Sequence, residues 1–230
     1  MSEFYKERSN HHCFGGQIGF YNHQSTETET EMNFSVFMPA QSNYSKVPAL
    51  LYLAGLTCTE ETFMIKAGAL KLASEKGLAL ICPDTSPRGA NIEGEDADWD
   101  FGTGAGFYLD ATQSPWAENY RMYSYITKEF IKLVEGSFPI DPQRIGIFGH
   151  SMGGHGALTL HLKNPTMFKT VSAFAPICAP TMCPWGEKAF SNYLGNNRDD
   201  WNKYDATQLI KTRGDGPKIL IDQGLADGFL

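Results

Sequence analysis

The chain has 230 residues, of which 42% are hydrophobic and 20% are charged. This length and composition suffice for one sizeable core and exclude a disordered, collagen-like or solenoid chain, so we expect one domain over residues 1–230. The formal net charge is −7 without a basic stripe, which argues against a nucleic-acid partner.

The N-terminal residues 1–10 are charged and polar, without the apolar run of a secretion signal. No later segment approaches the roughly 18 uninterrupted apolar residues of a membrane span. We therefore expect a cytoplasmic protein that does not associate with membranes.

The opening stretch, from Phe14 to Met38, alternates loosely between apolar and polar residues. This pattern predicts antiparallel structure at an edge of a sheet. The polar run from Ser25 to Thr30 is expected to form a solvated turn.

Four short apolar runs are bounded by Gly, Pro or Asp and predict strands that are buried on both faces: residues 48–53, 78–82, 144–148 and 218–221. Between them, Thr57 and Glu60 have the spacing of a capping box, which predicts a helical segment that ends near Gly77. A second helix is predicted by apolar residues at every fourth position: Met122, Ile126, Phe130 and Val134. Alternating strands and helices predict the α/β class, with a mostly parallel sheet covered on both faces.

The long segment from Ser86 to Pro115 is rich in glycine and aromatic residues. We expect an ordered surface excursion, because functional loops of this length tend to border active sites. Its Gly102-Thr103-Gly104-Ala105-Gly106 pattern has no apolar strand before it and no helix start after it. These are the elements that a phosphate cradle requires, so we expect no nucleotide cofactor.

The five cysteines are an odd number without closely spaced pairs, which predicts free thiols: Cys13, Cys58, Cys82, Cys178 and Cys183. Cys178 and Cys183 could supply half of a zinc site, but no second pair of cysteines or histidines follows at ligand spacing. We therefore expect no bound metal.

A G-x-S-x-G motif carries the chemistry. Gly149-His150-Ser151-Met152-Gly153 follows an apolar strand and precedes a plausible helix, the context that makes the serine a nucleophile on a strand-to-helix turn. The glycines are required because the turn leaves no room for Cβ atoms two residues either side of Ser151. The N-terminus of the following helix also points N–H groups toward the place where an oxyanion forms.

Serine needs a base, and the base needs an acid that fixes its tautomer. In this arrangement the acid follows a strand downstream of the nucleophile. Asp227 lies on a loop beyond Gly224, whereas Asp222 lies where the strand still runs. We favour Asp227, because such sites form outside the carboxyl ends of strands.

The base is expected to be a histidine after Asp227, but all six histidines precede it: His11, His12, His23, His150, His155 and His161. His150 and His155 lie beside Ser151 in the sequence and are interpreted as packing or hydrogen-bonding residues. Two explanations stay open. Either the sequence lacks its C-terminal portion, with a final helix, strand and histidine, or the protein is a relative without a base.

The residues closely resemble S-formylglutathione hydrolases, also called esterase D, of the α/β-hydrolase superfamily. The matching stretches span nearly the whole chain: Leu53-Ala54-Gly55-Leu56-Thr57-Cys58-Thr59-Glu60, Pro83-Asp84-Thr85-Ser86-Pro87-Arg88-Gly89, Trp99 to Tyr108, Gly149 to Leu158, Cys183-Pro184-Trp185-Gly186 and Asp222-Gln223-Gly224. The resemblance implies an α/β-hydrolase fold.

The resemblance also implies roles for individual residues. Ser151 and Asp227 would belong to a catalytic triad, and the backbone N–H groups of Leu56 and Met152 would form the oxyanion hole. Cys58 matches a cysteine near the active site that would make the activity sensitive to thiol reagents, and its alternative role is simple packing. Apart from the resemblance, Trp185 near the site could line its wall together with Trp99, Phe107 and Tyr108, but such aromatic residues more often belong to the core.

The activity that the resemblance implies is cleavage of S-formylglutathione to glutathione and formate in formaldehyde detoxification, without a cofactor. The family also implies a homodimer. One alternative is a promiscuous short-acyl carboxylesterase, because fold alone does not fix function. The other is a non-catalytic binding protein with this fold, if no C-terminal histidine exists.

Overall fold

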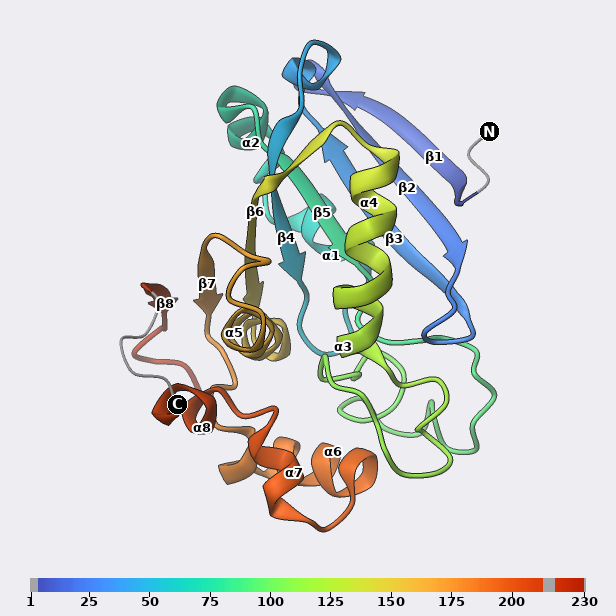
Figure 1. Cartoon of the computed structure of the whole chain (residues 1–230), viewed down its shortest axis with the longest axis vertical. Coiled ribbons are helices and arrows are strands. Elements are labelled where there is room, and N and C mark those ends of the chain that lie inside the picture. Colours follow the sequence, from blue (N-terminus) through green and yellow to red (C-terminus); the bar gives the residue numbers. More distant parts are fainter. Residues whose placement is uncertain (1–3, 213–217, 230) are drawn as a thin grey trace.

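The structure is a computed structural model that describes residues 4–212 and 218–229. Its centre is an eight-stranded sheet with the strand order β1-β2-β3-β5-β4-β6-β7-β8 (Figure 1). The strands are β1 (Lys6–Cys13), β2 (Gly16–Gln24), β3 (Glu31–Met38), β4 (Val47–Leu53), β5 (Ala79–Pro83), β6 (Ile140–His150), β7 (Val171–Phe174) and β8 (Ile219–Asp222). From β5 to β8 neighbouring strands are parallel, which confirms the predicted class.

Strands β2 and β3 form the antiparallel structure that the sequence predicts for residues 14–38, and β3 joins β5 in antiparallel pairing. Strand β1, which lies before that stretch and was not predicted, pairs with β2 at the edge of the sheet. The prediction of a solvated turn after β2 is only partly right, because Thr26 and Glu29 are exposed whereas Ser25, Thr28 and Thr30 are buried. The Glu129 carboxylate accepts hydrogen bonds from Ser25 Oγ at 2.6 Å and from the Thr26 N–H at 2.8 Å. A carboxylate from a distant helix thus takes the place of water.

Helices cover both faces of the sheet. They are α1 (Glu60–Lys66), α2 (Leu70–Lys76), α3 (Met122–Ser124), the π-helical segment η2 (Tyr125–Phe130), α4 (Ile131–Ser137), α5 (Met152–Lys163), α6 (Pro184–Leu194), α7 (Arg198–Asn202) and α8 (Ala206–Lys211), with 3-10 turns η1 (Ala40–Asn43) and η3 (Pro180–Met182). The larger core lies between the sheet and α3, α4 and α5. The smaller core lies under α1 and α2 on the other face.

Helix α1 begins differently from the prediction. Its N-cap is Thr59, which forms a capping box with Thr62, and not the pair Thr57 and Glu60. Thr57 has a left-handed φ of 66° and donates its N–H to the Gly104 carbonyl at 3.0 Å, so it belongs to the preceding loop. The helical segment does end at Gly77, whose φ of 66° closes α2.

The helix predicted from the four-residue period is confirmed: Met122, Ile126, Phe130 and Val134 are all buried along the continuous run from α3 through η2 to α4. The strand at residues 218–221 is confirmed as β8, but the prediction that both of its faces are buried is wrong. Leu220 is 58% exposed and Ile221 is 52% exposed, because β8 is the edge strand beside β7. No helix among the described residues is long and apolar enough to cross a membrane.

Candidate active site

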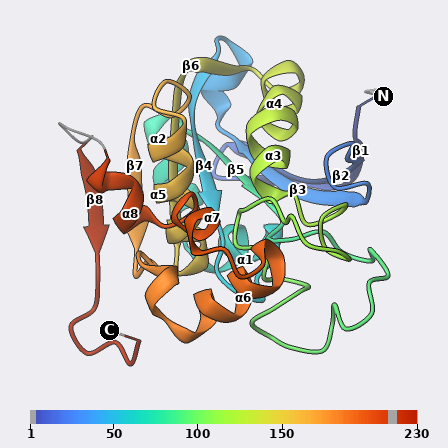
Figure 2. The same cartoon turned by 60° about the horizontal axis from the view of Figure 1, so that its bottom comes forward.

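The loops that follow β4, β5, β6 and β7 meet at the carboxyl edge of the sheet (Figure 2). Each loop contains non-glycine residues in the left-handed region: Thr57, Phe107, Tyr108, Ser151 and Ala175, with φ between 43° and 66°. Residues other than glycine rarely adopt this backbone conformation, and such backbone strain is common at functional sites. The carboxyl edge is therefore the candidate site, as the sequence predicts for a parallel sheet.

Ser151 occupies the turn between β6, which ends at His150, and α5, which begins at Met152. Its φ of 57° and ψ of −120° lie outside the helical and extended regions. The Ser151 N–H donates to the Phe174 carbonyl at 2.9 Å, and the Ser151 carbonyl accepts from the Ile177 N–H at 3.3 Å. Both backbone groups are thus fixed on the neighbouring loop, and the Ser151 side chain is half-buried at the surface.

The two glycines of the motif are required by packing. A Cβ atom at Gly149 would overlap the Gly153 carbonyl, and a Cβ atom at Gly153 would overlap the Leu53 carbonyl. The start of α5 is therefore in backbone contact with the ends of β4 and β6. This confirms the steric reason given for the glycines from the sequence.

The loop after β4 lies directly against the nucleophile. A Cβ atom at Gly55 would be 3.2 Å from Ser151 Cβ, so Leu56, the next residue, lies beside the turn. Among the hydrogen bonds of the described residues, the N–H groups of Leu56 and Met152 have no acceptor. Two free donors beside a serine are the ingredients of an oxyanion hole.

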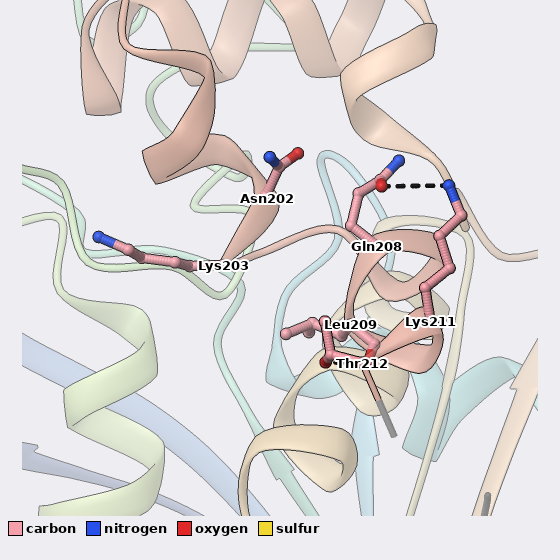
Figure 3. A pocket seen from close by; sticks show the side chains of 6 residues that line it. All are labelled: Asn202, Lys203, Gln208, Leu209, Lys211 and Thr212. Atoms are coloured by element: carbon pink, nitrogen blue, oxygen red, sulfur yellow. Dashed lines mark hydrogen bonds between the residues drawn. The ribbon is translucent and has the colours of Figure 1, made fainter. Parts of the chain in front are cut away.

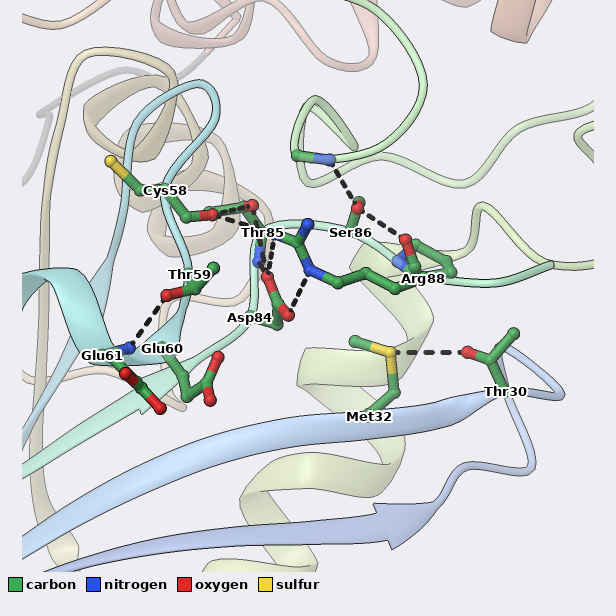
Figure 4. Close-up of polar contacts among 12 residues, drawn as sticks. Thr30, Met32, Cys58, Thr59, Glu60, Glu61, Asp84, Thr85, Ser86 and Arg88 are labelled. Carbon is green, nitrogen blue, oxygen red and sulfur yellow. Dashed lines mark hydrogen bonds and ion pairs between the residues drawn. The ribbon is translucent and has the colours of Figure 1, made fainter. Parts of the chain in front are cut away.

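A partly buried ion pair contacts this loop (Figure 4): the Arg88 side chain is 32% exposed and the Asp84 side chain is 2% exposed. Arg88 Nε donates to Asp84 Oδ2 at 2.7 Å, and the Asp84 pair is the main reason why the pKa of Arg88 is raised. The carbonyl of Cys58 accepts from Thr85 Oγ1 at 2.6 Å and from Arg88 Nη2 at 3.2 Å. The Cys58 thiol is half-buried and points away from the ion pair, so it is not part of this network.

The two candidate acids differ as their positions in the sequence suggest. Asp222 is the last residue of β8 and its side chain is exposed, whereas its carbonyl accepts from the Ala175 N–H at 2.7 Å. Asp227 lies on the following loop, where Oδ2 accepts from Gln223 Nε2 at 2.9 Å and Oδ1 accepts from the Phe229 N–H at 3.0 Å. The Asp227 carboxylate is thus oriented by two hydrogen bonds on the loop.

Of the aromatic candidates, Trp185 lies beside the acid loop. Its ring meets Phe229 edge-on with centroids 4.8 Å apart, and it meets the exposed Trp99 at 6.4 Å. Phe107 and Tyr108 are completely buried, so they belong to the core, the more frequent of the two roles considered from the sequence. The segment from Ser86 to Pro115 is therefore ordered, as predicted, but part of it belongs to the core and not to the surface.

His155 is a hydrogen-bonding residue, as the sequence suggests. It is buried, and its Nε2 lies 3.0 Å from the Phe107 carbonyl, so Nε2 carries the proton. Burial lowers the pKa of His155 to about 4. Within the described residues Ser151 Oγ has no hydrogen bond to any histidine, and no group of three His, Cys, Asp or Glu side chains could hold a metal.

A separate hollow of about 380 Å³ lies beside α7 and α8 (Figure 3). It is lined by Asn202, Lys203, Gln208, Leu209, Lys211 and Thr212, and Lys211 Nζ donates to Gln208 Oε1 at 3.2 Å. This lining contains neither a carboxylate nor an imidazole that could activate a nucleophile. This hollow therefore offers no acid–base chemistry of its own.

Two supporting contacts were not predicted from the sequence. One is the ion pair of Arg88 with Asp84, whose i,i+4 spacing would indicate a contact only on a helix, whereas these residues lie in a loop. The other is the hydrogen bond from the Tyr108 hydroxyl to the Ala54 carbonyl at 2.8 Å. It joins residues 54 positions apart, and no local pattern signals it.

Comparison with known proteins places this geometry in context. The family model described as "Putative esterase" matches residues 25–230. The chain is 56% identical to the S-formylglutathione hydrolase of Rattus norvegicus over 98% of its own length and 80% of that protein. It is 48% identical to that of Paracoccus denitrificans over 100% of its length and 82% of that protein.

Among solved structures, the S-formylglutathione hydrolase of Agrobacterium tumefaciens superposes with a TM-score of 0.95 at 49% identity. The match covers 98% of this chain and 81% of the other. Both strand order and sequence are therefore shared over almost the whole chain.

Proposed function

Because the chain belongs to the S-formylglutathione hydrolases, a family with the α/β-hydrolase fold, we propose that it hydrolyses S-formylglutathione to glutathione and formate. The observation that carries the proposal is the contact of the Gly55 backbone with Ser151, which brings the Leu56 N–H beside a serine on a strained turn. In the cell this reaction would serve formaldehyde detoxification. We extend the proposal to a cytoplasmic location and to a homodimer.

In the proposed first step, Ser151 Oγ attacks the formyl carbonyl and gives up its proton to the base. The carbonyl oxygen becomes an oxyanion that accepts hydrogen bonds from the N–H groups of Leu56 and Met152. The carbon–sulfur bond then breaks, and glutathione leaves as a thiolate that takes up the proton. Thiols ionise near pH 8.5, so this leaving group needs less protonation than an alcohol.

In the second step, the base activates a water molecule that attacks the formyl-serine ester. Formate leaves and Ser151 Oγ recovers its proton. Asp227 would hold the base in the correct tautomer, since its carboxylate is already oriented by Gln223 and the Phe229 N–H. We propose that the base is a histidine outside residues 1–230, because this chain spans about four fifths of the length of its relatives.

Two half-buried residues complete the proposed site. Cys58 lies on the loop that carries Leu56, so a bulky adduct on its thiol would crowd the oxyanion hole and lower activity. Trp185, beside the acid loop, would form part of the wall. Neither residue would take part in bond making.

The test is hydrolysis of S-formylglutathione by the protein expressed from its complete coding region, compared with Ser151→Ala. We expect turnover that the substitution lowers by several orders of magnitude, about 10⁶-fold in such enzymes. Ser45→Ala, at an exposed position before β4, is the control and should retain full activity.

The substrate preference separates the remaining possibilities. Turnover of p-nitrophenyl acetate that exceeds turnover of the formyl thioester would favour a general carboxylesterase. Absence of both activities, together with no labelling of Ser151 by a fluorophosphonate, would favour a non-catalytic protein and contradict the proposal.

A further inference from the structure

Phe107 and Tyr108 form a turn that the sequence gives no reason to expect. Their φ values are 47° and 51°, and both side chains are completely buried. Large aromatic residues are rare in the left-handed region, and such strain persists only where the surroundings impose it. The contacts of this turn should therefore show which function requires the strained conformation.

Helix α5, which begins at Met152 directly after the nucleophile, holds the turn in place. His155 Nε2 donates to the Phe107 carbonyl at 3.0 Å. The Tyr108 ring lies against Gly156, where a Cβ atom would overlap Tyr108 Cδ2 and would also be 3.0 Å from Leu53 Cδ1. The ring thus lies between the first turns of α5 and the end of β4.

The turn at Phe107 and Tyr108 also holds the loop that contains Leu56. The Tyr108 hydroxyl donates to the Ala54 carbonyl at 2.8 Å, two residues before Leu56. On the other side of Leu56, the Thr57 N–H donates to the Gly104 carbonyl at 3.0 Å. Residues 104–108 therefore fix the loop on both sides of Leu56, whose N–H is one of the two free donors beside Ser151.

The Tyr108 hydroxyl is suited to this task. It is completely buried, and burial raises the pKa of Tyr108 well above its usual value, so it stays protonated and can donate. Ala54 is also buried, so its carbonyl has no access to solvent as an alternative donor. Loss of the hydroxyl would leave that carbonyl unpaired and free to rotate with the loop.

We propose that Tyr108 is a positioning residue for the oxyanion hole, which aligns the Leu56 N–H with the nucleophile by holding the Ala54 carbonyl. The inference rests on the proposed function and adds a residue that does not touch the substrate. Misplacement of a reacting group by about 1 Å can cost about 10²-fold in rate. The change should destabilise the transition state, where the oxyanion forms, more than it destabilises the bound substrate.

The test is Tyr108→Phe in the protein from the complete coding region. We expect kcat to fall by about 10- to 100-fold with KM changed less than about twofold. Phenylboronic acid, whose serine adduct is tetrahedral and carries an oxygen in the oxyanion hole, should bind more weakly by a similar factor. The affinity for the product glutathione should not change.

Tyr125→Phe is the matched control. Tyr125 is also completely buried, and its hydroxyl is hydrogen-bonded to His23 Nε2 at 3.0 Å, away from the site. This variant should lose stability but keep kcat and boronate affinity. Gly156→Ala, which displaces the Tyr108 ring, should reproduce the kinetic pattern of Tyr108→Phe.

The proposal would be overturned if Tyr108→Phe kept the wild-type kcat, or if it weakened glutathione and boronate binding equally, as a general loosening would. Its failure can be told apart from failure of the proposed function. If the wild-type protein cleaves p-nitrophenyl acetate but not S-formylglutathione, the function is wrong, and the same comparison of variants is made with the ester. Boronate binding reports on the oxyanion hole in either case.

Discussion

Gly153 and Leu53 are in backbone contact, so close that a Cβ atom at Gly153 would overlap the Leu53 carbonyl oxygen. The contact joins the first turn of the nucleophile helix to the end of the central strand β4. Neither backbone can move aside without disturbing the other, because both are buried and hydrogen-bonded. The position of Ser151 therefore depends on a glycine at position 153.

Gly153→Ala should lower the free energy of unfolding by about 3 kcal/mol, at the upper end of overpacking effects, although alanine is the better helix former. Gly136→Ala is the control. Gly136 lies in α4 and a Cβ atom there has open space, so this change should stabilise by about 0.5–1 kcal/mol. Urea denaturation of both variants measures the two effects, and equal midpoints would contradict the argument.

Asp227→Asn should lower kcat by about 10⁴-fold, the size of effect seen when a triad acid becomes an amide. Asp222→Asn is the matched substitution five residues earlier, on an exposed side chain at the end of β8, and should change kcat less than about threefold. Steady-state kinetics with S-formylglutathione decide between them. A larger loss in Asp222→Asn would transfer the role of acid to that residue.

Arg88→Met should destabilise the protein by about 2–3 kcal/mol, because it leaves the buried Asp84 carboxylate without its cation. Arg144→Met removes the more exposed ion pair with Asp141 and should cost much less stability than Arg88→Met. The double variant with Asp84→Asn should regain part of the loss, since the unpaired charge is then gone. Thermal unfolding of the three variants checks this order.

The stability of the protein should fall between pH 6.5 and pH 4 in part because of His155. Burial lowers the pKa of His155 to about 4, whereas the hydrogen bond to the Phe107 carbonyl and the charge of Asp205 raise it by less. Below pH 6.5 the unfolded chain binds a proton at this histidine and the folded chain does not, so the folded state loses stability as the pH falls. At pH 4.5 the loss should be about 2–3 kcal/mol.

His155→Gln keeps a side-chain N–H for the Phe107 carbonyl but removes the titration. Urea denaturation at pH 7 and at pH 4.5 should therefore show a smaller fall for this variant than for the wild-type protein. Burial also lowers the pKa of His23, so a residual fall common to both proteins is expected. Identical falls in the two proteins would exclude His155 as a cause.

The sequence by itself determined the elements that depend on local physics. Apolar runs predicted β4, β5 and β6, a four-residue period predicted the helix from Met122 to Val134, and the steric demands of a strand-to-helix turn identified Ser151 and its two glycines. Each of these signals lies within a few neighbouring residues, because side-chain periodicity and Cβ clashes act over one turn or one strand. The resemblance to the family rested on the same short blocks.

Only the tertiary structure decided which polar groups meet across the chain. It joined the turn from Ser25 to Thr30 to the Glu129 carboxylate, left β8 half-exposed at the edge of the sheet, and placed the Tyr108 hydroxyl on the Ala54 carbonyl. These pairings join residues from 54 to 104 positions apart. A buried donor or acceptor must find a partner, but which partner it finds depends on how the whole chain closes around the core.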